Sequence, residues 1–181
     1  MRNSETGIRL YSTLTKRKEP LTTGPNGEVR IYACGPTVYS RIHIGNARPF
    51  VVFSVLARFL ERRGLRAIFA ANITDINDKI YDAARVEGIP STELAEKYAQ
   101  AYVDDTSRLG LGRPTHEPKV TELVPEIVQL IQDLIDNGLA YPADGDVYFR
   151  VERFAGYGKL SGRKLDEMRS EEHGSGKESP L

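Results

Sequence analysis

The sequence predicts an α/β fold with a parallel β-sheet. Residues 29–33 are rich in strand formers and run into the turn-forming residues 34–36. Apolar side chains then recur at helical spacing over residues 50–60, and Gly64 follows as a stop signal. Residues 67–71 form a short apolar run of the kind that a strand buried on both faces requires. Strand, helix and strand in this order predict a right-handed crossover between two parallel strands.

Two further helices are expected directly after the second strand. Residues 75–87 predict one helix, with Thr74 or Asp75 as its N-cap and Gly88 as its end. A second helix is expected to begin behind Ser91, which is a suitable N-cap residue. We expect both helices to pack against the sheet.

The remaining chain predicts one more helix and a hairpin. Residues 120–135 carry the strongest amphipathic pattern in the sequence, closed by the asparagine and glycine at 137–138. Residues 139–151 predict a β-hairpin around an Asp-Gly turn. Residues 170–181 have almost nothing to bury, so we expect a disordered tail.

Length and composition indicate a globular protein. The chain has 181 residues, which suits one main domain and the start of a second unit. Lys plus Arg and Asp plus Glu both number 25, so no overall positive field indicates a nucleic-acid partner. Arg58 and Arg62 interrupt the longest apolar stretches, and residues 1–20 contain no apolar signal segment. Cys34 is the only cysteine, which excludes an internal disulfide. We therefore expect a cytoplasmic protein without a membrane partner.

Residues 34–46, between the first strand and the first helix, are suited to binding an anion. In open α/β sheets, ligands bind at the carboxyl ends of the strands. A helix N-terminus offers unpaired N–H groups and about half a positive charge to a polyphosphate. Gly45 lets a ligand approach the backbone, while His43 and Asn46 can donate hydrogen bonds to phosphate oxygens. An isolated His-x-Gly triplet is more often an ordinary loop, so the interpretation depends on the surrounding sequence.

The surrounding sequence resembles a known family. Cys34-Gly35-Pro36-Thr37-Val38-Tyr39, followed by His43-Ile44-Gly45-Asn46, resembles the HIGH signature of class I aminoacyl-tRNA synthetases with the lead-in of the cysteine-specific members. Asn72-Ile73-Thr74-Asp75-Ile76-Asn77-Asp78-Lys79-Ile80 is similar to the segment after the second strand of cysteinyl-tRNA synthetases. Further similar segments are residues 10–15, 47–49 and 157–161. The resemblance extends from about Ile8 to Arg169.

The resemblance implies a Rossmann-like nucleotide-binding domain with the class I synthetase catalytic fold, present here in part. Residues 1–114 would form the N-terminal half of this catalytic domain. Residues 115–169 would add a helix and a β-hairpin as the start of an inserted connective segment. Asn46 stands at the last position of the HIGH signature, and Asn77 stands where the family usually has an aspartate.

The resemblance also implies roles for particular residues. Cys34 would be one ligand of a zinc ion that binds the substrate thiolate and selects cysteine over serine, because zinc prefers a thiolate to a hydroxyl. For Cys34 by itself, a buried free thiol is the alternative. Residues lining the cysteine pocket would be Gly35, Thr37 and Thr74. Residues binding ATP, with its Mg²⁺, would be Tyr39, His43, Gly45 and Asn46, of which His43 and Asn46 would be catalytic.

The family's reaction is the ATP-dependent activation of cysteine to cysteinyl-adenylate, followed by transfer to tRNA(Cys). The other zinc ligands, the KMSKS signature and the anticodon-binding helices have no counterpart in residues 1–181. We therefore expect this chain alone to hold zinc weakly and not to charge tRNA, whether it is a truncation, a frameshift product or a gene fragment.

Two other functions remain open from the sequence. A related cysteine ligase of thiol biosynthesis, which joins activated cysteine to an amino sugar, shares the fold, the zinc cysteine and the ATP motif. A non-catalytic module that binds a nucleotide or a partner protein is the other alternative. The sequence leaves the oligomeric state open.

Overall fold

The computed structural model describes residues 6–163, which separate into two compact units. One unit holds Thr22–Val124 and the other holds Gly7–Leu21 together with the residues from Pro125 onward. The first unit carries a parallel sheet and three helices, whereas the second carries two antiparallel hairpins and a helix. Within the described residues, no helix combines the length and apolarity needed to cross a bilayer.

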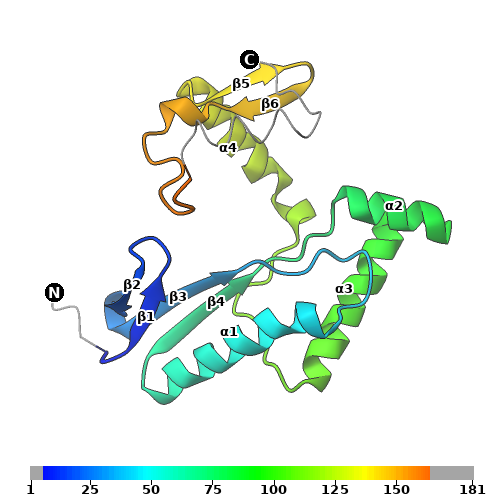
Figure 1. Ribbon diagram of the computed structural model, residues 1–181. Helices are drawn as coiled ribbons and strands as arrows, with labels where there is room; N and C mark the ends of the chain where they lie inside the picture. The colour runs from blue at the N-terminus through cyan, green and yellow to red at the C-terminus, as the bar shows by residue number, and fades with distance from the viewer. Residues whose placement is uncertain (1–5, 164–181) are drawn as a thin grey trace. The chain divides into compact units, whose positions relative to one another are not determined.

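The centre of the first unit is the predicted strand–helix–strand crossover (Figure 1). Strands β3 (Glu28–Ala33) and β4 (Arg66–Ala71) pair in parallel along their whole length, and α1 (Ile44–Arg62) connects them. Side chains alternate between the two faces of a strand. On one face, Ala33, Phe69 and Ala71 form a buried cluster, against which Phe53 of α1 packs. The prediction of two parallel neighbours joined by this helix is therefore confirmed.

A third segment extends the sheet beside β4, which the sequence did not predict. Residues 116–119 run parallel to β4 through isolated bridges from Ala70 to His116 and from Ile73 to Lys119. The backbone N–H of Ile73 donates to the carbonyl of Pro118 over 2.8 Å. Proline cannot donate to a β-ladder, so a segment with a proline in its middle gives no strand signal. The carbonyl of Pro118 can still accept the hydrogen bond from Ile73, so this segment pairs with the β4 side of the sheet.

Helix α2 (Asp78–Glu87) begins later than predicted. Its N-cap is Asn77, whose side-chain oxygen accepts from the N–H of Lys79 over 3.0 Å. The prediction of Thr74 or Asp75 as the cap is wrong, because Thr74 remains extended and continues the parallel pairing beyond β4. The helix ends as predicted at Gly88, which has a φ of 70°.

Helix α3 (Ser91–Arg108) starts at Ser91 itself, so the prediction of Ser91 as the N-cap is wrong by one position. Pro90 occupies the cap position with an extended backbone. Helices α2 and α3 lie beyond the carboxyl ends of β3 and β4 (Figure 1), and their main partners are each other, α1 and the loops that follow the strands, rather than the sheet itself. The buried residues of this cluster are Val38, Phe50, Ile73, Ile80, Ala84, Leu94, Ala95, Ala99 and Tyr102.

The helix predicted from residue 120 forms in two parts. A 3₁₀ turn (Val120–Leu123) precedes α4 (Val124–Asp136). Pro125 lies in the first turn of α4, where its missing N–H costs no helical hydrogen bond. Gly138, with a φ of 69°, follows the helix as expected. Two other short 3₁₀ turns span Pro25–Gly27 and Val151–Arg153.

The second unit contains the predicted hairpin and one that was not predicted. Strands β5 (Ala140–Ala143) and β6 (Asp146–Phe149) pair antiparallel around Asp144 and Gly145, whose φ angles of 51° and 89° are typical of a two-residue hairpin turn. Strands β1 (Arg9–Ser12) and β2 (Arg17–Pro20) form the other hairpin. The tail predicted at residues 170–181 lies outside the described residues.

Candidate active site

The carboxyl ends of β3 and β4 bring the predicted cysteine-pocket residues together. The backbone N–H of Thr74 donates to the carbonyl of Pro36 over 2.9 Å, and the N–H of Val38 donates to the carbonyl of Thr74 over 3.1 Å. These bonds set Thr37 beside Thr74 in a parallel bridge. Gly35 lies in the same loop, one residue before Pro36. Thr74, which follows Thr37 by 37 positions in the sequence, therefore shares one sheet edge with Gly35 and Thr37.

Gly35 is required by a close approach of the two loops. A β-carbon at this position would lie 1.5 Å from the carbonyl oxygen of Asn72, so no larger residue fits without moving backbone. The N–H of Gly35 donates to the side-chain oxygen of Asn72 over 3.2 Å. Asn72 was not among the predicted site residues, although it stands directly after the second strand and opens the segment 72–80 that resembles the family.

Cys34 follows β3 and is exposed to solvent, so the alternative of a buried free thiol is wrong. Within residues 6–163, no group of three or more Cys, His, Asp and Glu side chains is placed to hold a metal ion. A zinc site requires several such ligands in tetrahedral arrangement. The described residues thus offer one sulfur ligand and do not form a zinc site by themselves.

His43 and Asn46 cap the start of α1 reciprocally. The N–H of Gly45 donates to Nδ1 of His43 over 3.0 Å, and the N–H of His43 donates to Oδ1 of Asn46 over 3.3 Å. The sequence predicted that this helix start would offer unpaired N–H groups to an anion. For Gly45 that prediction is wrong, because its N–H is already used by the cap.

The cap determines which atoms of the two side chains can face a ligand. A backbone N–H can only donate, so Nδ1 of His43 carries no hydrogen and the neutral ring has its proton on Nε2. By the same reasoning, Oδ1 of Asn46 accepts from the N–H of His43, and the NH₂ group of Asn46 remains available as a donor. Both side chains are exposed. This helix start therefore presents two side-chain donors, Nε2–H and Nδ2–H, to an anion.

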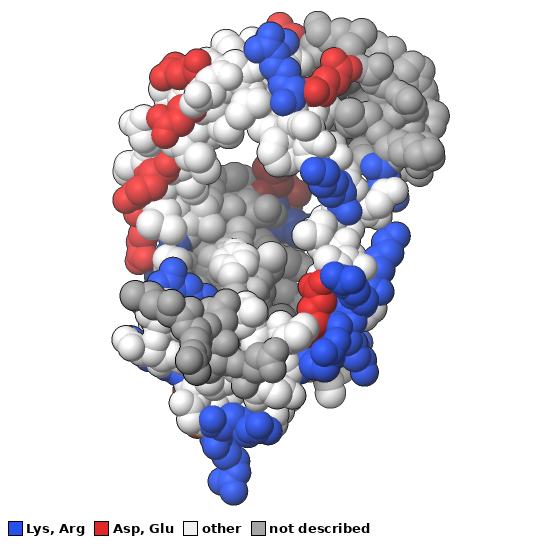
Figure 2. Space-filling view, turned by 90° about the vertical axis from the view of Figure 1, so that its left-hand side faces the viewer, with Lys and Arg blue, Asp and Glu red and all other residues white. Residues whose placement is uncertain are grey.

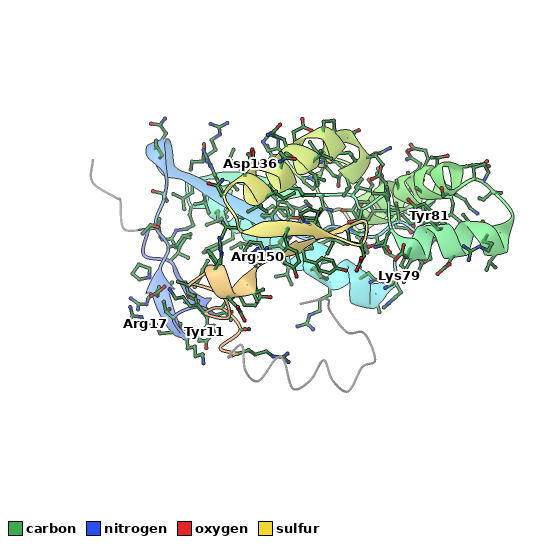
Figure 3. All side chains as sticks on the ribbon, turned by 90° about the horizontal axis from the view of Figure 1, so that it is seen from above. Tyr11, Arg17, Lys79, Tyr81, Asp136 and Arg150 are labelled. Atoms are coloured by element: carbon green, nitrogen blue, oxygen red, sulfur yellow. The ribbon has the colours of Figure 1, made fainter. Side chains whose placement is uncertain are left out.

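A lysine lies next to the predicted ATP-binding residue Tyr39. Lys79 and Tyr81 project from the start of α2 (Figure 3), and the ammonium of Lys79 lies 5.6 Å from the ring centroid of Tyr39. A cation at this distance from an aromatic face is attracted by the ring. Lys79 thus places a positive charge beside the loop that leads to the helix start.

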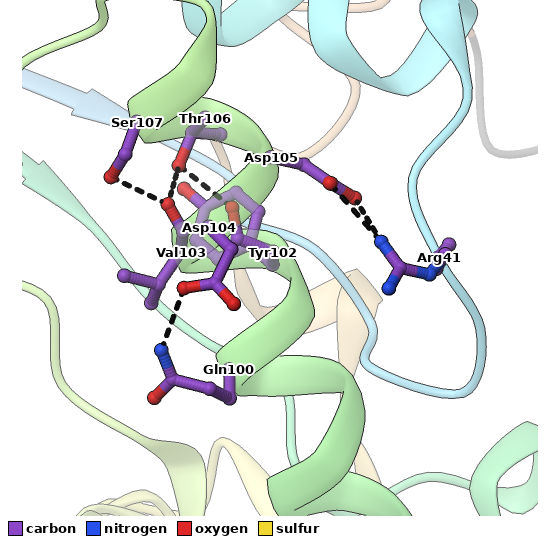
Figure 4. Close-up of polar contacts among 8 residues, drawn as sticks. All are labelled: Arg41, Gln100, Tyr102, Val103, Asp104, Asp105, Thr106 and Ser107. Carbon is purple, nitrogen blue, oxygen red and sulfur yellow. Dashed lines mark hydrogen bonds and ion pairs between the residues drawn. The ribbon is translucent and has the colours of Figure 1, made fainter.

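Arg41 ties the same loop to α3 (Figure 4). One nitrogen of its guanidinium lies 3.1 Å and 3.2 Å from the two carboxylate oxygens of Asp105. The pair is 64 residues apart in sequence, so no local pattern could have predicted it. Asp105 neutralises the positive charge of Arg41. Arg41 therefore contributes to the site by fixing the loop after β3 to α3.

The loop after β4 is held from its other side by Asp75. Its carboxylate accepts from the backbone N–H of Thr121 over 3.0 Å and from the hydroxyl of the same residue. Nearby, Lys119 forms an ion pair with Glu96, and this hydrogen bond raises the pKa of the Lys119 ammonium. Asp75 is thus an anchor for the segment carrying Thr74.

Basic and acidic side chains are equal in number, so the chain carries no net charge that would attract an anion from a distance. On the face drawn in Figure 2, basic and acidic side chains both occur, and neither sign covers the face. At the carboxyl edge of the sheet, the ammonium of Lys79 beside Tyr39 provides a local positive charge that can attract an anion.

A parallel strand–helix–strand unit with polar loops at its carboxyl edge defines a Rossmann-like α/β domain. Solved synthetase structures share this fold. The LeuRS of Agrobacterium radiobacter K84 agnB2, in a ternary complex with tRNA and LeuAMS, superposes with a TM-score of 0.57 at 22% identity, covering 65% of this chain and 15% of that one. The methionyl-tRNA synthetase of Mycobacterium tuberculosis, in complex with methionyl-adenylate, gives 0.52 at 15% identity, covering 66% and 28%.

The family follows from the sequence match. Residues 20–180 match the family of tRNA synthetases class I (C), catalytic domain, and the chain belongs to this family. The cysteine–tRNA ligase of Brevibacillus brevis is 48% identical over 164 residues, which are 91% of this chain and 35% of that protein. That of Solidesulfovibrio magneticus is 48% identical over 178 residues, 96% of this chain and 37% of that protein. The chain thus spans about a third of the length of these relatives.

Proposed function

We propose that this chain supplies the ATP- and cysteine-binding part of a cysteine–tRNA ligase. The observation that carries this function is the joint placement of Cys34, Gly35, Thr37 and Thr74 at one sheet edge, in a loop that leads directly to the donors at the start of α1. The relatives named cysteine–tRNA ligase favour this function over amino-sugar ligation. The proposed role in translation supports a cytoplasmic location.

The proposed reaction has two steps. A carboxylate oxygen of cysteine attacks the α-phosphorus of ATP, and the bond from that phosphorus to pyrophosphate breaks, which leaves cysteinyl-adenylate. A ribose hydroxyl at the 3′ end of tRNA(Cys) then attacks the carbonyl carbon and loses its proton, the carbonyl–oxygen bond of the mixed anhydride breaks, and AMP leaves with the bridging oxygen. Mg²⁺ accompanies ATP and neutralises part of the phosphate charge.

The protein's task in the first step is to position the reactants and to stabilise negative charge. We assign the phosphate oxygens to the Nε2–H of His43 and the NH₂ group of Asn46. Gly45 leaves room for the nucleotide against the helix start, and the exposed ring of Tyr39 offers it a surface. The positive end of α1 adds to this stabilisation.

The amino acid would bind on the other side of the same loop. We assign cysteine to the sheet edge formed by Gly35, Thr37 and Thr74, where the close approach of Asn72 to Gly35 holds the two loops together. Cys34 offers a sulfur atom at the same edge. Because the described residues gather no further zinc ligands around it, no step of the proposed reaction is routed through zinc.

The test is cysteine-dependent exchange of pyrophosphate into ATP, together with transfer of cysteine to tRNA(Cys), measured in a full-length protein that contains these residues, because residues 1–181 alone are not expected to charge tRNA. The informative variant is His43→Asn, because asparagine is a good N-cap and keeps α1 capped while removing the Nε2 donor. If His43 stabilises charge like other such donors, exchange falls by about 10²- to 10³-fold. His43→Ala should lose both the donor and the cap.

Three results would change the assignment. Exchange that is unaltered in His43→Asn would remove His43 from the catalytic residues. Nucleotide binding that is independent of cysteine, without exchange, would indicate a non-catalytic nucleotide-binding module. Transfer of activated cysteine to an amino sugar and not to tRNA would indicate the ligase of thiol biosynthesis.

A further inference from the structure

The side chain of Asn72 connects both loops of the candidate cysteine pocket. Its oxygen accepts from the backbone N–H of Gly35 over 3.2 Å and from the hydroxyl of Tyr32 over 2.9 Å. Its nitrogen donates to the hydroxyl oxygen of Thr74 over 2.9 Å. One amide therefore contacts the loop after β3, the end of β3 itself and the loop after β4.

The hydrogen-bond directions in this network follow from one fixed donor. The N–H of Gly35 can only donate, so the atom of Asn72 that faces it must be the oxygen. The NH₂ group consequently faces Thr74, whose hydroxyl oxygen must accept. A hydroxyl has a single hydrogen, and acceptance from Asn72 leaves that hydrogen available for another partner.

The backbone N–H of Thr74 is already used, so the hydroxyl is the only donor that this residue can offer a ligand. Its N–H donates to Pro36 and its carbonyl accepts from Val38, so both main-chain groups are used in the sheet. Thr74 is partly exposed at the carboxyl edge, where ligands of α/β sheets bind. A hydroxyl held in this way presents a hydrogen, and its natural partner is an anionic acceptor.

We propose that Asn72 is a positioning residue that makes the Thr74 hydroxyl a hydrogen-bond donor to an anionic group of bound cysteine. This role rests on the proposed function, because it assigns cysteine to the pocket. The acceptor is the carboxylate or the thiolate of the amino acid. The ammonium group could meet only the second lone pair of the hydroxyl oxygen, and a bond there would still leave the hydrogen for the anionic group.

The direction of the Asn72–Thr74 hydrogen bond can be tested without ligand. In the isotopically labelled 181-residue chain, NMR reports the side-chain amide protons of Asn72 and their exchange with water. Thr74→Val removes the acceptor, so the bonded amide proton should move upfield and exchange faster. Thr74→Ser keeps the hydroxyl and should restore the original signal. An amide signal that Thr74→Val leaves unchanged would overturn the inference.

The effect on the ligand is tested by titrating the same samples with L-cysteine. Asn72→Asp is nearly isosteric and keeps the acceptor for Gly35, but its carboxylate takes the Thr74 hydrogen for itself. Loss of one hydrogen bond to a charged group predicts about ten- to a hundredfold weaker binding of cysteine. Thr74→Val should weaken cysteine binding to a similar degree. Thr74→Ser keeps the hydroxyl and should bind cysteine with nearly the affinity of the unaltered chain.

The double variant Asn72→Asp/Thr74→Val separates an effect through the Thr74 hydroxyl from a direct effect of the new charge at position 72. If Asn72 acts through Thr74, Asn72→Asp should cost little further affinity once Thr74 is valine, because the hydrogen in question is already gone. A full additional loss in the double variant would show a direct charge effect and overturn the inference. Equal binding by Asn72→Asp and the unaltered chain would overturn it as well.

These results also separate the inference from the proposed function. If the unaltered chain shows no cysteine-dependent signal, the assignment of cysteine to this pocket fails and the ligand part of the inference fails with it. If the unaltered chain binds cysteine and Asn72→Asp binds equally well, the pocket stands and only the role of Asn72 is lost.

Discussion

Replacing Gly35 by alanine should disrupt the edge at which the candidate site is built. The added β-carbon would lie 1.5 Å from the carbonyl oxygen of Asn72 and 2.7 Å from its carbonyl carbon, whereas ordinary contacts begin near 3.4 Å. The nearest atoms belong to backbone, so no side-chain rotation can relieve the overlap. The two loops must therefore separate by roughly 2 Å.

The cost can be worked from the hydrogen bonds that such a movement breaks. They join Gly35 to the Asn72 side chain over 3.2 Å, Thr74 to Pro36 over 2.9 Å, and Val38 to Thr74 over 3.1 Å. At about 1 kcal/mol net for each bond, the loss is about 3 kcal/mol, the upper end of what overpacking usually costs. With a typical dependence on urea, the unfolding midpoint should fall by roughly 1–2 M.

The assay is urea unfolding followed by circular dichroism, with Gly112→Ala as the matched control. Gly112 has no atom within 4 Å of an added β-carbon and no positive φ, so its substitution should be nearly neutral. If Gly35→Ala unfolded at the same urea concentration as Gly112→Ala, the close approach of the two loops would be refuted. Gly35→Ala should lose cysteine binding, whereas Gly112→Ala should keep it.

Three other substitutions test the elements around the site. Asn77→Ala removes the N-cap of α2 and should cost about 1 kcal/mol in urea unfolding. The hydrogen bond from Lys97 holds the pKa of Glu87 below 4.5, so this carboxylate contributes stability above pH 4.5 that is lost as pH falls through its lowered pKa. Glu87→Gln should therefore lose less stability than the unaltered chain between about pH 6 and about pH 3. Asp105→Asn weakens the exposed pair with Arg41 and should cost at most about 1 kcal/mol of stability, while nucleotide affinity, measured by titration, falls because the loop is less ordered.

Local sequence chemistry determined the strand–helix–strand order in the first unit and the C-terminal ends of α1 and α2. The crossover between β3 and β4 was predictable because apolar periodicity and turn residues act over a few positions. Gly88 marked the end of α2 for the same reason, since a left-handed residue terminates a helix wherever the helix lies. The donors at the start of α1, His43 and Asn46, could also be chosen from sequence, because an N-cap and its third residue are close neighbours.

The tertiary structure alone decided what depends on strand pairing. Thr74 could not be recognised as a sheet residue rather than a helix cap until it was seen to pair with Thr37. The same pairing brought Asn72 against Gly35 and fixed the direction of its hydrogen bonds. Residues 116–119 joined the sheet although their composition gives no strand signal. These features share one physical cause: each depends on a contact between segments far apart in the chain, which exists only after the parallel sheet has formed and which no local propensity encodes.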